Sequence, residues 1–339
     1  MQSFKQRRLA WLPVVLAFGV LAAACGGDDD DADTGTGGEG GGASGSINIS
    51  GSSTVEPISS LAAEAFQGEN SDVTIAVDGP GTGDGFELFC NGETDISDAS
   101  RAISDEEIAA CEQNGVEYVE LQVAYDGMAV MTNANNDAVE CLSFADLYAL
   151  IGPEAEGVDN WSGAATIAGE LGSDTEFPDA SLELSGPGAE SGTYDSFIEI
   201  ALEGIAEERG QEATTRSDYA SSADDNVIIQ NIEASDTSLG WVGFAFAEEA
   251  GDAIIEIPIS EEPGGDCVEP SAETISDGSY PLSRPLFIYV STNNAEENET
   301  LAAFVDFYLE NLTEFVEEGG YVTMPDDQVE TTSAAWADR

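Results

Sequence analysis

From Ile47 onward, short apolar runs that suit β-strands alternate with longer segments that have helical spacing. Strands are expected at 47–50 and 73–77, and the segment between them, 55–66, has the spacing of a helix. The other expected strands are 116–123, 128–132, 239–246 and 254–259, and the other expected helices are 143–151, 194–209 and 301–318. This alternation predicts an α/β fold with mainly parallel sheets.

The N-terminus has the features of an export signal. Basic residues lie within positions 5–8, and the apolar stretch 9–20 is too short to span a bilayer of about 30 Å. The run Leu21-Ala22-Ala23-Ala24-Cys25-Gly26 then resembles a bacterial lipobox, in which the Cys is lipidated. We expect residues 1–24 to be a lipoprotein signal peptide and Cys25 to hold the chain by lipid on the outer face of the cell membrane. A plain secretory peptide is the alternative.

The segment after Cys25 has no apolar residue larger than Ala up to position 45. Such a composition cannot bury enough surface to offset the entropy of ordering. Residues 25–45 are therefore expected to be a flexible, acidic, Gly-rich linker.

The composition is strongly acidic, with 68 Asp plus Glu against 8 Lys plus Arg and a formal net charge of −60. Three of the cations lie in the signal segment, so that five Arg and no Lys remain after it. This balance excludes nucleic acid as a partner, because phosphate backbones require a basic face. The excess of acids fits adaptation to salt, which screens self-repulsion.

Four Cys follow the lipobox, namely Cys90, Cys111, Cys141 and Cys267. An even number in an exported chain predicts two disulfides, and three pairings are open. Cys90–Cys111 with Cys141–Cys267 is preferred, because the first two are close in sequence. The sequence has no His and no CxxC spacing, so we expect no metal site and no cofactor.

Three loops share one design: each is rich in Gly and hydroxyl residues, follows a strand-like stretch and opens an expected helix. They are 51–55, 79–85 and 186–194. Gly permits close backbone approach, and N–H groups at helix N-termini together with hydroxyls can hold an anion without net charge. One such loop is common, because Ser and Thr cap many helices. Three together predict an oxyanion site.

One of the few cations lies close to these loops in the sequence. Arg101 ends the run Asp95-Ile96-Ser97-Asp98-Ala99-Ser100-Arg101. Arg suits bidentate recognition of an oxyanion. A surface salt bridge is the competing interpretation, since 68 acids are available as partners.

Several motifs, in the same order along the chain, resemble the PstS-type phosphate-binding proteins of ABC importers. They are GSSTV (51–55), GTGDGF (81–86), GETDISDASR (92–101), SGTYD (191–195), DDNV (224–227), LGWVGF (239–244) and PLSRPL (281–286). The resemblance covers roughly residues 47–328.

The resemblance implies an α/β fold of the periplasmic-binding-protein type (type II), with two α/β lobes, two hinge crossings and a ligand cleft between the lobes. Lobe I is expected to comprise 46–124 plus 286–339, and lobe II 125–285. The crossings are expected near 123–126 and 284–287.

The resemblance also implies a function. The chain is expected to capture inorganic phosphate, to deliver it to ABC permease subunits in the membrane, to act as a monomer and not to be an enzyme. The residues expected to bind the ligand are Ser53, Thr54, Thr82, Ser100, Arg101, Ser191, Gly192 and Thr193.

Two positions depart from well-known members of this family. An Arg is missing before the Ser-Gly-Thr run, where this chain has residues 186–189, and Ser100 stands in place of an Asp. Arg101 is expected to replace the lost cation. Glu190 or Asp195 is the expected acceptor for the proton of phosphate, which separates phosphate from fully ionised sulfate.

Three alternatives stay open or are disfavoured. Another tetrahedral oxyanion such as sulfate or molybdate, or a role as a phosphate sensor, remains compatible with the sequence. A phosphatase is disfavoured, because the chain has no His and no Lys after the signal segment to activate a nucleophile.

Arg284 is interpreted as a salt-bridge partner at the second crossing, and Tyr125-Asp126 as a cleft or hinge position.

Overall fold

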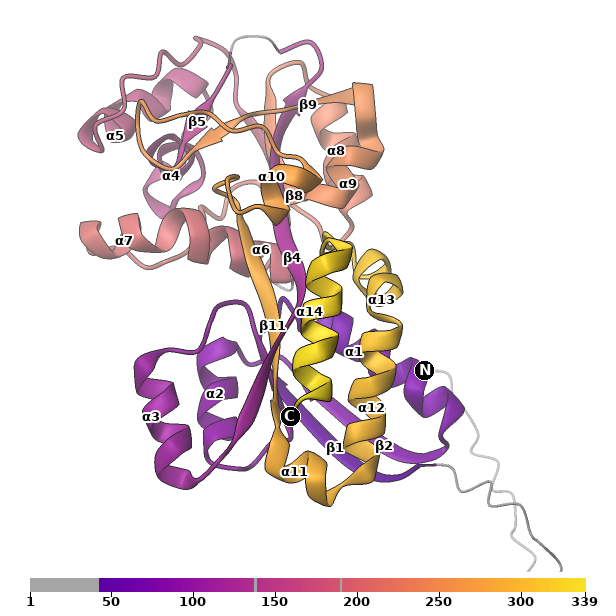
Figure 1. Cartoon of the computed structure of the whole chain (residues 1–339). Coiled ribbons are helices and arrows are strands. Elements are labelled where there is room, and N and C mark those ends of the chain that lie inside the picture. Colours follow the sequence, from indigo (N-terminus) through magenta and orange to yellow (C-terminus); the bar gives the residue numbers. More distant parts are fainter. Residues whose placement is uncertain (1–42, 137–138, 190) are drawn as a thin grey trace, which may run out of the picture. The chain divides into compact units, whose positions relative to one another are not determined.

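The structure is a computed structural model that describes residues 43–136, 139–189 and 191–339. Its elements form two α/β lobes that share the strands β4 and β11 (Figure 1). The lipidation site expected at Cys25 and the expected signal peptide lie outside the described residues. The α/β fold class with two lobes, predicted from the sequence, is confirmed.

Lobe I is built on a sheet with the strand order β2-β1-β3-β11-β4. Its strands are β1 (Ser44–Gly51), β2 (Asp72–Asp78), β3 (Ile96–Ala99), β4 (Tyr118–Asn133) and β11 (Ser283–Ser291). β1 is parallel to β2 and β3, whereas β11 is antiparallel to β3 and β4. Because β1 begins at Ser44, the expected linker is too long by two residues.

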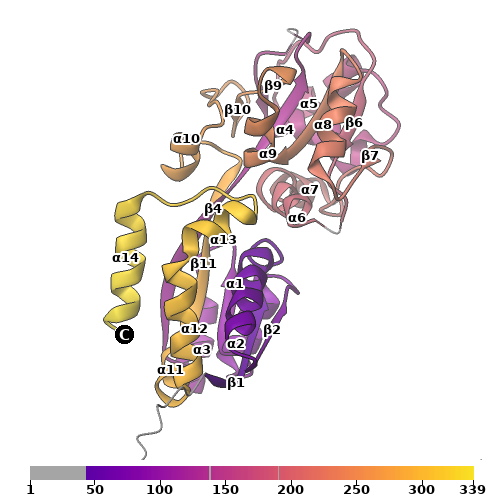
Figure 2. The same ribbon diagram turned by 90° about the vertical axis from the view of Figure 1, so that its right-hand side faces the viewer.

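Helices cover both faces of this sheet (Figures 1 and 2). Alternation along β11 sends Ile288 into the core with α1 and α12, and Phe287 and Tyr289 into a separate aromatic cluster with α2 and α3. The helices of this lobe are α1 (Glu56–Glu69), α2 (Thr82–Cys90), α3 (Asp105–Asn114), α11 (Thr292–Glu297), α12 (Glu299–Glu310), α13 (Leu312–Glu318) and α14 (Asp326–Ala337).

Lobe II continues the sheet from the second half of β4 in the order β4-β8-β6-β7. Its strands are β6 (Glu183–Gly186), β7 (Ala220–Ser221), β8 (Ser238–Gly243) and β9 (Ile254–Glu256), with β5 (Leu142–Ser143) and β10 (Ile259–Ser260) in a separate small sheet. Its α-helices are α4 (Phe144–Ile151), α5 (Ala165–Glu170), α6 (Gly192–Phe197), α7 (Glu203–Arg209), α8 (Asp225–Glu233), α9 (Phe244–Ala250) and α10 (Ala272–Ser276).

Short helical turns complete lobe II. A π-helical turn, Ile198–Leu202, joins α6 to α7. Three 3₁₀ turns lie at Pro153–Ala155, Trp161–Ala164 and Gly251–Ala253.

Several expectations about the elements need correction. The sheet is mixed rather than mainly parallel, because β4 and β11 run against their neighbours. The strands expected at 116–123 and 128–132 are one continuous strand, β4. The strand expected at 239–246 ends at Gly243, where α9 begins. The helix expected at 301–318 is divided into α12 and α13 at Asn311.

The chain crosses from one lobe to the other within β4 and again within β11. β4 pairs with β11 up to Gly127 and with β8 from Met128 onward. β11 pairs with β4 alone over its first residues and adds β3 from Phe287, next to a register shift between Leu286 and Phe287. The lobe boundaries drawn from the sequence at 124/125 and 285/286 remain predictions.

The preferred disulfide pairing is present. Cys90–Cys111 joins α2 to α3, and Cys141–Cys267 joins the segments next to β5 and β10. Within the described ranges, no helix combines the length and the hydropathy that crossing a bilayer requires.

Candidate functional site

The three Gly- and hydroxyl-rich loops all connect a strand to a helix N-terminus, as predicted. The first joins β1 to α1, the second joins β2 to α2, and the third joins β6 to α6. The first two belong to lobe I and the third belongs to lobe II. Their helix N-termini supply N–H groups with a partial positive charge, which suits an anion.

The first and third loops touch each other across the lobes. Ser53 Oγ donates a hydrogen bond to Asp195 Oδ2 at 2.8 Å, and the hydroxyls of Thr54 and Ser196 are 3.1 Å apart. A Cβ atom on Gly192 would lie 3.1 Å from Thr54 Cα and 3.2 Å from the Ser53 carbonyl oxygen. Gly192 therefore favours this close approach of α6 to the first loop, because a side chain there would be tightly packed against the loop backbone.

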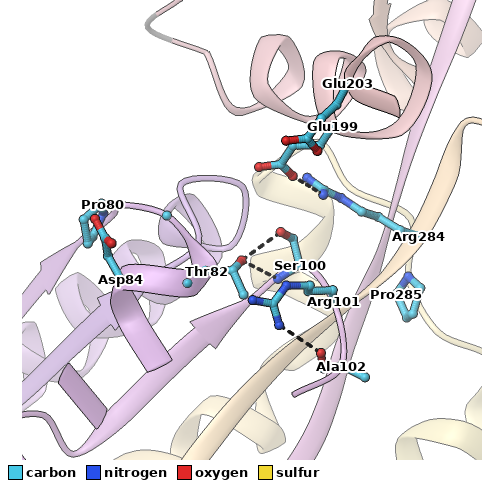
Figure 3. A pocket seen from close by; sticks show the side chains of 12 residues that line it. Pro80, Thr82, Asp84, Ser100, Arg101, Ala102, Glu199, Glu203, Arg284 and Pro285 are labelled. Atoms are coloured by element: carbon cyan, nitrogen blue, oxygen red, sulfur yellow. Dashed lines mark hydrogen bonds and ion pairs between the residues drawn. The ribbon is translucent and has the colours of Figure 1, made fainter. Parts of the chain in front are cut away.

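The second loop lies beside the end of β3. Thr82 Oγ1 is 3.0 Å from Ser100 Oγ and accepts the Ser100 N–H at 3.2 Å. Both residues line a cavity of roughly 700 Å³ that also borders Arg101 and, from the other side, Glu199 and Arg284 (Figure 3). This cavity is the candidate ligand cleft.

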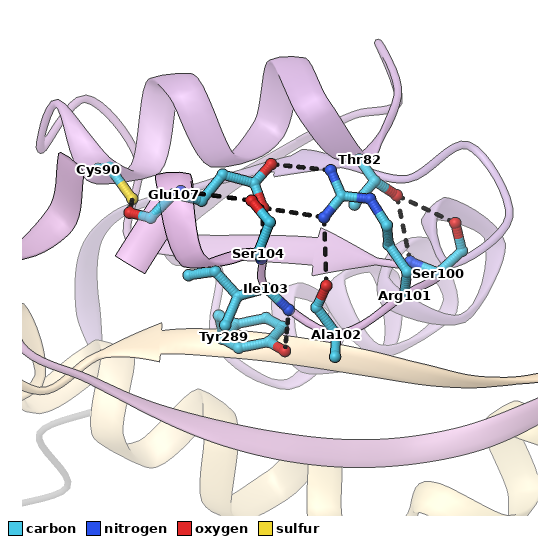
Figure 4. Close-up of polar contacts among 9 residues, drawn as sticks. All are labelled: Thr82, Cys90, Ser100, Arg101, Ala102, Ile103, Ser104, Glu107 and Tyr289. Carbon is cyan, nitrogen blue, oxygen red and sulfur yellow. Dashed lines mark hydrogen bonds and ion pairs between the residues drawn. The ribbon is translucent and has the colours of Figure 1, made fainter. Parts of the chain in front are cut away.

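Arg101 lines the cleft, but its guanidinium is already paired within lobe I (Figure 4). Two of its nitrogens donate to Glu107 at 2.8 Å each, and its Cζ lies 5.5 Å from the centre of the Phe86 ring. Glu107 also closes the capping box of α3 with Ser104. Partial burial tends to raise the pKa of Glu107, but the hydrogen bonds from Arg101 and Ser104 outweigh burial and lower it. In the structure Arg101 therefore forms a salt bridge, which was the competing interpretation of this residue. Its side chain is 47% exposed.

Arg284 is the cation that links the two lobes, and it was not among the residues expected to bind ligand. Its side chain, 13% exposed, donates to Thr54 Oγ1 at 3.1 Å and to Ser196 Oγ at 2.7 Å. It also pairs with Glu199 on the π-helical turn of lobe II (Figure 3). The sequence indicated a salt bridge at the crossing, but nothing local to PLSRPL shows that the side chain reaches the first loop.

Asp126 lies behind Arg284 on the neighbouring strand. The two residues are Cα partners in the pairing of β4 with β11, and Asp126 Oδ2 is 3.5 Å from Arg284 Nε. The carboxylate is 4% exposed, and burial raises its pKa despite the opposing effect of the Arg284 charge. Asp126 therefore holds Arg284 from the strand side. Its neighbour Tyr125 donates instead to Gln328 on α14.

The Ser-Gly-Thr run begins α6. Ser191 Oγ accepts the N–H of Thr193 at 3.2 Å and so caps the helix. Ser191 and Gly192 border a second hollow with Ser53 and Asp195, and Gly192 and Thr193 border a third with Asp126. The structure thus brings Ser53, Thr54 and the Ser-Gly-Thr run together. Glu190, one of the two expected proton acceptors, lies outside the described residues.

The remaining Arg residues are engaged elsewhere. Arg209 pairs with Glu154 and Glu170, Arg216 with Asp218, and Arg339 stacks on Trp336. Arg101 and Arg284 are therefore the two cations available to the cleft.

In the part of the chain that the structure describes, no cluster of three or more Cys, Asp or Glu side chains could hold a metal ion.

Comparison with known proteins gives consistent results. The family model of the PBP superfamily domain matches residues 36–311. Protein SphX of Synechocystis sp. is 40% identical over 284 residues, which cover 83% of this chain and 79% of SphX. The phosphate-binding protein PstS of Staphylococcus haemolyticus is 36% identical over 314 residues, 92% of this chain and 91% of PstS. The crystal structure of a possible phosphate binding protein from Planctomyces limnophilus is similar with a TM-score of 0.79 and 36% identity, over 87% of this chain and 99% of that one.

Proposed function

The chain belongs to the PBP superfamily, together with the phosphate-binding proteins PstS and SphX, and from this premise we propose that it captures inorganic phosphate in the interlobe cleft and delivers it to an ABC permease. The observation that carries the proposal is one cavity lined by the start of α2, Ser100 and two Arg side chains, of which Arg284 also donates to Thr54 of the first loop and to Ser196 of α6. Such a site binds an oxyanion through directed N–H and O–H donors, even in a chain of net charge −60.

The donors come from both lobes, so that bound phosphate would hold them together. Lobe I supplies hydroxyl or N–H groups and one guanidinium, and lobe II supplies the start of α6. Ligand capture would then proceed by closure of the lobes and exclusion of water from the donors. The proposed ligand-binding residues are Ser53, Thr54, Thr82, Ser100, Arg101, Ser191, Gly192 and Thr193.

Asp195 is the proposed acceptor for the phosphate proton. It lies beside the first loop, where its carboxylate accepts a hydrogen bond from Ser53 at 2.8 Å. A carboxylate in a phosphate site favours an anion that still carries a proton and repels fully ionised sulfate. Glu190 remains the second candidate.

The protein is proposed to act outside the cytoplasm as a monomer, held at the outer face of the membrane by a lipid on Cys25. The export signal in the sequence and the two disulfides support this location, because disulfides persist in oxidising compartments. Binding without catalysis fits the assignment, since the similar proteins are named for binding phosphate.

Calorimetric titration of the chain from residue 26 onward, with phosphate and then sulfate in high-salt buffer, tests this function. We expect tight binding of phosphate and no response to sulfate. Arg101→Ala should weaken phosphate binding by about tenfold, because a charge-assisted donor is lost at a half-exposed position.

Arg209→Ala is the matched control, since it removes the same charge from a residue that pairs with Glu154 and Glu170 and does not line the cleft. Equal binding of sulfate and phosphate would overturn phosphate as the ligand. Unchanged affinity in Arg101→Ala would remove Arg101 from the site.

A further inference from the structure

We propose that Arg284 binds the captured anion directly and that Glu199 occupies its guanidinium until the anion displaces it. This inference rests on the proposed function and adds a ligand-binding residue and a built-in competitor to it. The juxtaposition that carries it is a single guanidinium at the edge of the cleft. It pairs with the exposed carboxylate of Glu199 (Figure 3) and also donates to the first loop and to α6.

The position of Arg284 suits an anion held by both lobes. One of its terminal nitrogens, Nη2, already donates to Thr54 on lobe I and to Ser196 on lobe II, at 3.1 and 2.7 Å. Two hydroxyls and a guanidinium thus lie within hydrogen-bond distance of one another, between the start of α1 and the end of α6. An oxyanion that replaced the direct Thr54–Ser196 contact would receive donors from all three groups.

The two carboxylates on Arg284 differ in how firmly they are held. Asp126 is 4% exposed and lies on β4, in register with Arg284 on β11, so that the strand pairing fixes it. Glu199 is 48% exposed and lies on the π-helical turn after α6. An ion pair with a half-exposed carboxylate is worth little, because water and salt screen it. Glu199 is therefore the partner that an incoming anion can replace, while Asp126 keeps the guanidinium in place.

Glu199 then opposes binding in two ways. The anion must break the pair between Glu199 and Arg284, and the bound anion must tolerate a second negative charge close by. Removing that charge should tighten binding. A residue that only supported the fold would not produce a gain in affinity when it is altered, so this direction is diagnostic.

The test is calorimetric titration of inorganic phosphate into the chain from residue 26, as wild type and as Glu199→Gln. Gln keeps the size of the side chain and its hydrogen-bonding capacity but removes the charge. We expect Glu199→Gln to bind phosphate at least about threefold more tightly, with the gain shrinking as salt rises. Arg284→Lys should bind phosphate at least about tenfold more weakly, because an ammonium cannot reproduce the guanidinium contacts.

Glu203→Gln is the matched control. Glu203 lines the same cleft and carries the same charge, but it has no ion pair with Arg284 among the described contacts. A gain in Glu199→Gln that clearly exceeds the change in Glu203→Gln supports the displacement of Glu199. Unchanged or weaker binding in Glu199→Gln, or an equal gain in both variants, would overturn it. Absence of phosphate binding by the wild type would overturn the proposed function, and this inference with it.

Discussion

The carboxyl group of Asp98 lies fully buried behind the first Gly- and hydroxyl-rich loop. Its Oδ1 accepts a hydrogen bond from Ser59 at 2.9 Å, and its backbone carbonyl accepts the N–H of Ser52 at the same distance. Its Oδ2 has no hydrogen-bond partner among the described residues. Burial raises the pKa of Asp98 to about 7, against an opposing effect of the Ser59 hydrogen bond, and the nearby Glu56 charge adds to the rise.

Replacing Asp98 should change how stability depends on pH. Because its pKa is higher in the folded chain than its ordinary value of 3.8, the folded state holds the proton while the unfolded state loses it. The free energy of unfolding therefore falls as the pH rises between about 4 and 7, and the loss is complete above that window. In Asp98→Asn this loss is absent, so the variant should gain roughly 4 kcal/mol relative to wild type between about pH 4 and pH 8. Urea unfolding at both pH values measures the gain, and a difference that did not vary with pH would contradict it.

Single residues were predictable from the sequence only where their role is local. Thr82 and Ser191 begin helices and carry hydroxyls, and the loop pattern alone indicated them. The role of Arg284 could not be predicted in this way, because it depends on a contact with Thr54, 230 positions away along the chain. Arg101 was expected in the cleft and lines it, but Glu107, six positions later, takes its guanidinium. A local sequence pattern cannot show which of many acids a cation will select.

At the scale of elements, the strand–loop–helix units were predictable because each is encoded within about 30 residues. The joining of 116–123 and 128–132 into β4 was not, because Tyr125-Asp126-Gly127 has the composition of a turn and is kept extended by pairing with β11. Similarly, Phe244 to Phe246 has the residues of a strand, but β8 ends at Gly243 and the chain enters α9. Tertiary context overrides local propensity at both places.

The contact between α6 and the first loop gives a prediction about elements. Gly192→Ala would place a methyl group 3.1 Å from Thr54 Cα, so that the two elements must shift apart by a few tenths of an ångström. Overpacking of this kind costs about 1–3 kcal/mol, and here the cost falls on the approach of the two lobes. Phosphate affinity should therefore fall by roughly tenfold. Gly204→Ala on α7, where a methyl group meets open space, is the control for calorimetric titration. Equal affinities in the two variants would argue against the contact.

For the whole molecule, charge is the dominant property. With 68 acids against 8 cations, the folded chain carries strong self-repulsion, and only screening relieves it. The melting temperature should rise substantially between about 0.1 M and about 2 M NaCl, where the Debye length falls from about 10 Å to below 3 Å. Thermal unfolding followed by circular dichroism measures this, and a melting temperature independent of salt would contradict the prediction.

The pairing of β4 with β11 has a mechanical consequence for the whole molecule. The two crossings are adjacent hydrogen-bonded strands, from Ser283 opposite Gly127 to Ser291 opposite Tyr118. Sliding one crossing along the other would break that ladder, whereas flexing both together would not. The two paired crossings can therefore bend or twist together but resist sliding past each other, which restricts the motion of the lobes. One distance between two labels, one on each lobe, would follow it. In the chain from residue 26, all four Cys are joined in disulfides, so that introduced Cys residues would accept those labels selectively.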